Sequence, residues 1–115
     1  HEEATSLSPR CHDKMEVGMI VSNEPGYYKE GSHGIRIENL ILCIDTGDKD
    51  ELGRAVLAFD TLTLAPIDQR LIDKNMLDDD EIEWLNHYHA RILKEISPSL
   101  TNEEIMWLQG ACKAL

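Results

Sequence analysis

At 115 residues, 42% of them hydrophobic, the chain is long enough for one domain with a buried core. Its formal net charge of −11 argues against nucleic acid as a partner, because phosphate binding depends on clustered Lys and Arg. No apolar run approaches the roughly 18 residues that span a bilayer, so we expect no membrane insertion.

The N-terminal part, residues 1–17, is polar and contains Ser8-Pro9, which predicts a loop. The chain opens at His1 without an initiator Met, and we expect it to be a piece of a longer protein. Three cysteines without CxxC spacing indicate reduced thiols, as in a cytoplasmic protein.

A long β-hairpin is predicted next. Two strand-like runs, 18–24 and 34–44, flank a segment whose Pro and Gly residues mark turns. Both faces of the second run are largely apolar, so we expect this strand to be buried on both sides. Arg36 and Glu38 inside such a strand need partners, and an ion pair between them is the alternative to a functional site.

Two carboxylates are expected to face each other across this hairpin. If its arms pair symmetrically about Gly31, Glu24 stands directly opposite Glu38. Directly opposed residues share a face with Cβ atoms roughly 4.5–5.5 Å apart, so the two carboxylates repel unless a positive charge lies between them. A metal cluster would remove that penalty.

The hairpin is followed by a polar segment and a further strand. Residues 45–51, DTGDKDE, are predicted to be a solvated turn. Residues 55–64 alternate as a third strand, which would pair antiparallel with the second and end before Pro66.

The last third of the chain is predicted to be helical. Asp78 followed by Glu81 forms a capping box for a helix of residues 79–96. Thr101 with Glu104 repeats the pattern for a second helix.

Aromatic residues and histidines occur along these helices. Trp84, Tyr88 and Trp107 are expected to pack in the core, with a subunit interface as the alternative. His87 and His89 are two residues apart, so they point to different sides of a helix and cannot share a metal. Both are interpreted as surface or capping residues.

Three stretches of the chain resemble one family of metallopeptidases. The run NEPGYYKEGSHGIRIEN, residues 23–39, is similar to the C-terminal signature of the pita-bread metallopeptidases, and most to cytosolic Xaa-Pro aminopeptidases. The resemblance continues through LTLAPIDQRLID, residues 62–73, and WLNHYH, residues 84–89. It implies an α+β fold, the C-terminal portion of a pita-bread fold, with a small antiparallel sheet and C-terminal helices. Residues 1–65 would be the C-terminal half of the catalytic domain, and residues 66–115 would be a helical C-terminal extension.

The resemblance also implies roles for five residues. Glu24 and Glu38 match two of five ligands to two divalent metal ions, for which Mn²⁺ is expected, and Glu24 would also act as a general acid/base. Arg36 and Tyr28 would orient these ligands, although Tyr28 could instead be a half-buried turn aromatic. His1 matches a substrate-contacting His, with an ordinary terminal His as the alternative.

The function implied by the family is removal of the N-terminal residue from peptides with Pro in the second position. Because the other three ligands would lie upstream of His1, we expect the chain alone to be inactive and to hold metal weakly. A non-catalytic pita-bread module that binds peptides, or a prolidase, are the alternatives. Exposed sheet edges favour self-association, and we expect a homodimer.

Overall fold

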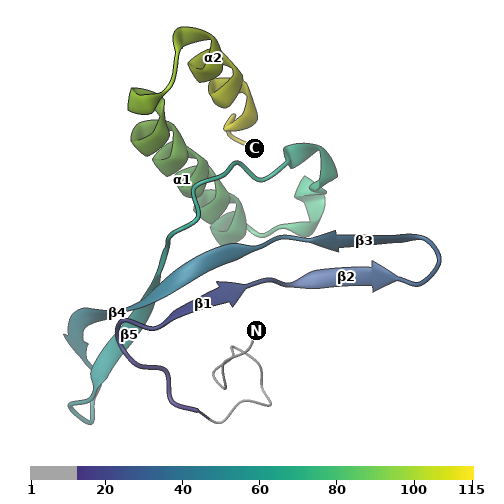
Figure 1. Ribbon diagram of the computed structural model, residues 1–115. Coiled ribbons are helices and arrows are strands. Elements are labelled where there is room, and N and C mark those ends of the chain that lie inside the picture. The colour runs from purple at the N-terminus through teal and green to yellow at the C-terminus, as the bar shows by residue number, and fades with distance from the viewer. Residues whose placement is uncertain (1–12) are drawn as a thin grey trace. The chain divides into compact units, whose positions relative to one another are not determined.

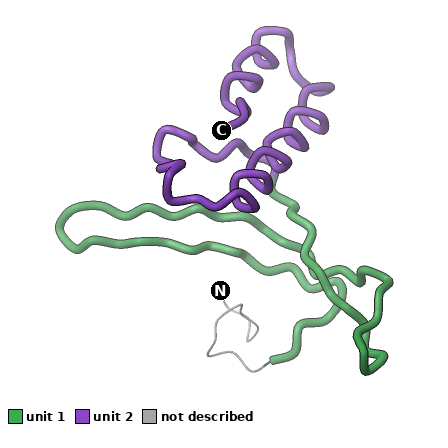
Figure 2. The backbone as a smooth tube through the Cα atoms, turned by 180° about the vertical axis from the view of Figure 1, so that it is seen from behind, with its two compact units in different colours: residues 1–63 green, residues 64–115 purple. Residues whose placement is uncertain are grey.

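The computed structural model describes residues 13–115, which form two compact units. The first ends at Thr63 and the second begins at Leu64 (Figure 2). Within the described residues, the strands belong to the first unit and the α-helices to the second. This is the α+β composition that the sequence predicts.

The first unit is built from antiparallel strands (Figure 1). They are β1 (Ile20–Asn23), β2 (Gly26–Lys29), β3 (His33–Arg36), β4 (Asn39–Lys49) and β5 (Ala55–Thr61). One sheet has the order β1-β4-β5, and β2 pairs with β3 in a two-stranded sheet. Since β2 continues β1 and β3 leads into β4, the two ladders form one long hairpin, as predicted.

The hairpin keeps a single register along its whole length. Ile20 lies opposite Leu42 in one ladder and Lys29 lies opposite His33 in the other, so each pair is equidistant from Gly31 in the sequence. Gly31 has a φ of +68° at the turn, a conformation that L side chains rarely adopt. The predicted symmetry about Gly31 is confirmed.

The predicted solvated turn at residues 45–51 is wrong, because β4 extends to Lys49 and pairs there with β5. The turn itself lies around Asp50, whose carboxylate accepts hydrogen bonds from the amides of Leu52 and Arg54 at 2.9 Å each. The polar composition had suggested a loop, but cross-strand pairing with β5 outweighs it. A register irregularity between Asp45 and Lys49 accommodates the polar segment.

The expected burial of the second strand on both faces is also wrong. Ile41 and Cys43 are buried, and they share one face of β4. By contrast, Ile35 and Ile37 are substantially exposed, and so is Leu40. Apolar alternation predicted the strand, but burial also requires neighbouring groups to cover each face.

The second unit contains both predicted helices. Helix α1 is Asp79–Ile96 and helix α2 is Asn102–Ala111, and each begins with a complete capping box. Asp78 accepts from the Glu81 amide at 2.8 Å, while a Glu81 carboxylate oxygen accepts from the Asp78 amide at 3.0 Å. Three short 3-10 turns complete the unit: η1 (Gln69–Leu71), η2 (Lys74–Met76) and η3 (Ser97–Ser99).

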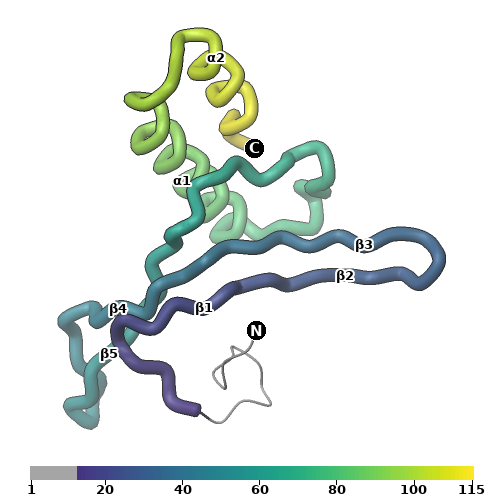
Figure 3. The backbone as a smooth tube through the Cα atoms, viewed as in Figure 1, coloured from purple at the N-terminus to yellow at the C-terminus, as the bar shows by residue number. Residues whose placement is uncertain are grey.

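A cluster of side chains from both helices forms the core of this unit. Its buried members are Leu85, Tyr88, Ile92, Leu108 and Cys112. The chain after α2 returns toward the segment that precedes η1 and toward α1 (Figure 3), and the Leu115 amide donates to the Asn86 side chain at 2.9 Å. The second unit is therefore a small helical body with its own core.

Two predictions for the helices are wrong. Trp84 and Trp107 were expected in the core, but they are 51% and 68% exposed, and only Tyr88 of the three aromatics is buried. His89 was expected at the surface, but it is 0% exposed, because residues 65–69 pack on its side of α1 and give its ring polar partners. His87 is exposed, as predicted, 4.0 Å from Glu83. Among the described residues, no helix has the length and apolar character needed to cross a membrane.

Candidate active site

Glu24 and Glu38 lie in the short interruptions between the two ladders of the hairpin. The β1–β4 ladder ends on one side of them, and on the other side the Ile37 amide donates to the Pro25 carbonyl at 3.2 Å. Because the register does not change across this gap, Glu24 stands opposite Glu38. Opposed residues of an antiparallel pair point to the same face, so the hairpin brings the two carboxylates together as predicted.

A guanidinium group lies between these carboxylates. Arg36 Nη1 is 3.6 Å from a Glu24 carboxylate oxygen, and Arg36 Nη2 is 3.1 Å from a Glu38 carboxylate oxygen. The ion pair of Arg36 with Glu38, given above as the alternative to a functional site, is present, and it extends to Glu24. Arg36 therefore supplies the positive charge that two opposed carboxylates require.

Tyr28 packs against the backbone next to this arginine. A Cβ added at Gly26 would lie 2.7 Å from the Tyr28 hydroxyl oxygen, and one at Gly34 would lie 2.7 Å from its ring. Gly26 is paired with Arg36, so the phenol reaches the guanidinium across the strand pair. The two glycines thus leave the space that the ring occupies.

The charges and hydrogen bonds around Arg36 reinforce one another. A side-chain hydrogen bond with Tyr28, followed by the Glu38 carboxylate, raises the pKa of Arg36 above its ordinary value. Ser22 is on the same face as Glu24, and its hydroxyl donates to Glu24 Oε1 at 2.8 Å. Arg36 is therefore a fixed cation at this site.

The hairpin face that carries Glu24, Arg36 and Glu38 is open to solvent. The Arg36 and Glu38 side chains are about half exposed, and Glu24 is partly buried. Carboxylate oxygens are ligands that hard divalent cations accept, and both glutamates present them on one accessible face, so the donor set fits part of a metal centre. Within residues 13–115, however, no group of three or more His, Cys, Asp or Glu side chains could hold a metal ion.

Of the predicted site residues, four lie together on this face: Glu24, Tyr28, Arg36 and Glu38. His1 lies outside the described residues. Sequence reasoning missed Ser22. Its position two residues before Glu24 in a strand places it on the same face, so period-two alternation was the signal that could have found it.

Two opposed carboxylates on an accessible face could supply some of the ligands of a two-metal hydrolase site. Residues 55–115 match the family described as the C-terminal region of peptidase_M24, and residues 1–45 match metallopeptidase family M24. The chain belongs to this peptidase_M24 family.

Two relatives of this chain are both named as aminopeptidases. The chain is 42% identical to aminopeptidase P2 from Arabidopsis thaliana over 113 residues, which is 93% of this chain and 16% of that protein. It is 39% identical to Xaa-Pro aminopeptidase app-1 from Caenorhabditis elegans over 108 residues, 89% of this chain and 17% of that protein. The chain therefore spans about a sixth of the length of these relatives.

A solved structure shares the fold. It is the X-prolyl aminopeptidase from Caenorhabditis elegans, described as a cytosolic enzyme with a di-nuclear active site. The TM-score is 0.78 at 37% identity, covering 88% of this chain and 17% of that protein. The chain has the fold of the C-terminal portion of a pita-bread aminopeptidase.

Proposed function

We propose that this chain is part of a cytoplasmic Xaa-Pro aminopeptidase, which removes the N-terminal residue from peptides with Pro in the second position. The observation that carries the proposal is the opposition of Glu24 and Glu38 on an accessible face. The names of the relatives and of the solved structure support the same reaction.

Glu24 and Glu38 would hold metal in the complete protein. Two divalent ions are proposed, with Mn²⁺ as the metal, because carboxylate oxygens suit it. When bound, such a pair supplies Lewis-acid activation of water and of the peptide carbonyl.

The side chains of the hairpin have separate tasks in this reaction. Glu24 would accept a proton at a carboxylate oxygen and pass it to the leaving amine, while Ser22 holds its Oε1 in place. Arg36 and Tyr28 would position the two glutamates, since the guanidinium contacts both carboxylates. A positioning role suits the ion pairs of Arg36 with both glutamates and the hydrogen bond of Tyr28 with Arg36.

The chain alone would be inactive. Two carboxylates cannot hold a tight two-metal site, and the resemblance assigns the other three ligands to sequence upstream of His1. Peptides containing Pro are the proposed substrates of the complete protein, which we further propose to be a homodimer. His1 would contact the substrate there.

A non-catalytic peptide-binding module is the second candidate. Arg36 already compensates the charge of Glu24 and Glu38, so the face is electrostatically balanced without metal. A protein that had lost its metals could keep this arrangement as a structural ion-pair network.

Hydrolysis of an Xaa-Pro peptide with added Mn²⁺ tests the proposal, run on this chain and on the full-length protein that contains it. Activity is expected only in the full-length protein. Glu24→Gln or Glu38→Gln should lower it on the order of a thousandfold, because each removes several kcal/mol of transition-state stabilisation.

The matched control is Glu30→Gln, which changes an exposed glutamate at the tip of the same hairpin and should leave activity unchanged. Metal content measured on each variant should fall for the Glu24 and Glu38 changes and not for Glu30. A full-length protein that neither binds Mn²⁺ nor cleaves the peptide would establish the non-catalytic module. Cleavage of Xaa-Pro dipeptides alone would establish a prolidase.

A further inference from the structure

His89 is a buried ring on α1 that holds another segment of the second unit. Its Nε2 accepts a hydrogen bond from the Ile67 amide at 3.1 Å, and its Nδ1 is 3.2 Å from the Gln69 side-chain nitrogen. Gln69 also donates to the Lys113 carbonyl. The imidazole therefore ties α1 to the segment before η1, and Gln69 connects that segment to the C-terminal end.

The preceding residue of α1 secures the same segment. The Tyr88 hydroxyl donates to the Ala65 carbonyl at 3.0 Å, and the Ala65 amide donates back to the hydroxyl oxygen at 3.4 Å. Consecutive residues of one helix thus hold residues 65–69 through their backbone. Only the His89 contact depends on a group that titrates near neutral pH.

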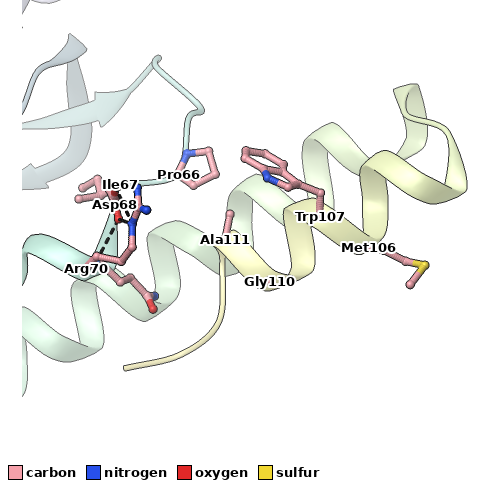
Figure 4. A pocket seen from close by; sticks show the side chains of 9 residues that line it. Pro66, Ile67, Asp68, Arg70, Met106, Trp107, Gly110 and Ala111 are labelled. Carbon is pink, nitrogen blue, oxygen red and sulfur yellow. Dashed lines mark hydrogen bonds and ion pairs between the residues drawn. The ribbon is translucent and has the colours of Figure 1, made fainter.

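The segment held in this way forms one wall of a groove (Figure 4). Pro66, Ile67 and Arg70 line one side, and Trp107 and Met106 of α2 line the other. The groove has a volume of about 620 Å³. Movement of residues 66–70 would therefore change the surroundings of the Trp107 indole.

The hydrogen bond from Ile67 requires an unprotonated Nε2. A protonated imidazole carries N–H groups on both nitrogens and cannot accept the amide proton. Burial lowers the pKa of His89, which acts in the same direction. A charged ring and the present position of Ile67 are thus incompatible.

The charged and titratable groups around the ring come from three elements. In the held segment, the Arg70 side chain hydrogen-bonds to Asp68 and lowers the pKa of that carboxyl to about 2, so Asp68 stays ionised and already paired near pH 6. At the C-terminal end lie the cation Lys113 and the buried thiol of Cys112, whose pKa burial raises. On α1 itself, the Tyr88 ring centroid is 5.9 Å from that of His89. None of these supplies an unpaired carboxylate to a protonated ring.

We propose that His89 is a pH-sensitive latch that fixes residues 65–69, which form part of the groove wall opposite Trp107, when neutral and releases them when protonated. In the released state the ring has an ordinary pKa of about 6.5. If the latched ring stays neutral, the equilibrium constant for release rises up to about tenfold between pH 7.5 and pH 5.5. The stabilisation of this segment by the neutral ring is nearly complete at pH 7.5 and is lost progressively as the pH falls through about 6.5.

Hydrogen exchange on this chain tests the latch. Protection factors of the Ile67 amide, corrected for the intrinsic effect of pH, should fall up to about tenfold from pH 7.5 to pH 5.5. In His89→Gln a side-chain oxygen can accept the same amide proton without titrating, so the pH dependence should disappear. His87→Gln is the matched control on the same helix and should retain it, since His87 is exposed.

Two further measurements need no change at His89. The ring carbon signals of His89, followed by NMR, should titrate below the ordinary histidine value, because burial lowers the pKa of this ring. In Trp84→Phe, fluorescence of the remaining Trp107 should change with the same midpoint as the Ile67 protection. A His89 signal that titrates at the ordinary value with constant Ile67 protection would overturn the latch, as would a pH dependence that survives in His89→Gln.

Discussion

The two units of this chain bury their apolar side chains to very different extents. In the second unit, side chains of both helices close over a common cluster. In the hairpin of the first unit, by contrast, Tyr27, Tyr28, Ile35 and Ile37 all remain exposed. The helical unit therefore gains stability from its own core, whereas the hairpin is specified by strand pairing, its turn and its ion pairs.

The core cluster and the residues proposed for catalysis therefore lie in different units of the chain. The residues proposed for catalysis are on the hairpin, where many of the described apolar side chains are exposed, and they are ordered by local register. Polar groups in the helical unit serve its packing instead, as Tyr88 and His89 do. Substitutions in the two units should consequently be read out by different measurements.

The largest difference is expected for isoleucine truncation. Ile92→Ala removes a side chain that is 0% exposed in the helical core and should lower the free energy of unfolding of that unit by about 2–5 kcal/mol. Ile35→Ala is the matched change in the hairpin, where the side chain is 43% exposed, and should cost less than about 1 kcal/mol. Chemical denaturation followed by helical circular dichroism measures both.

If the two substitutions had equal effects on the helical signal, the helical unit would not have an independent core. Loss of the helical signal in Ile35→Ala alone would reverse the comparison.

A smaller effect is expected at the start of α1. Asp78→Ala removes the side-chain acceptor of the Glu81 amide and should lower the free energy of unfolding by about 1 kcal/mol. Asp79→Ala, one residue into the helix, keeps the cap and should have a smaller effect. Thermal melting of the two variants side by side would show the difference, and equal melting temperatures would mean that the cap contributes nothing.

The smallest effect on folding, but a direct one on the candidate site, is expected for Gly34→Ala. The new Cβ would lie 2.7 Å from the Tyr28 ring, so the ring must shift from its place beside Arg36. The helical unit should melt unchanged, whereas contacts between the Tyr28 ring and residue 34 seen by NMR should be rearranged. In the full-length protein, peptide hydrolysis should fall, since Tyr28 is proposed to position Arg36. Unaltered ring contacts would show that the close approach is not rigid.

Features that depend on local sequence were predictable. Both capping boxes are fixed by residues three positions apart, and the bounds of α1 agree with the structure. The opposition of Glu24 and Glu38 followed from symmetry about Gly31, because turn position sets hairpin register. Their role as metal ligands stays a prediction.

Features that depend on distant partners were not predictable from the pattern. The burial of His89 requires knowing that residues 65–69 pack on its side of α1. The strand character of residues 45–49 comes from β5, not from their own polar composition. Likewise, the position of each tryptophan within its own helix did not reveal that Trp84 and Trp107 both have too few neighbours to be buried.

The symmetry of the hairpin about Gly31 also limits how the length of this chain can change through evolution. One residue inserted or deleted within an arm, between the tip and its glutamate, shifts that glutamate by one position and moves it to the opposite face from the other. Such a change has to be balanced by a compensating bulge before the two carboxylates meet again. Descendants of this sequence should therefore keep equal numbers of residues in the two arms.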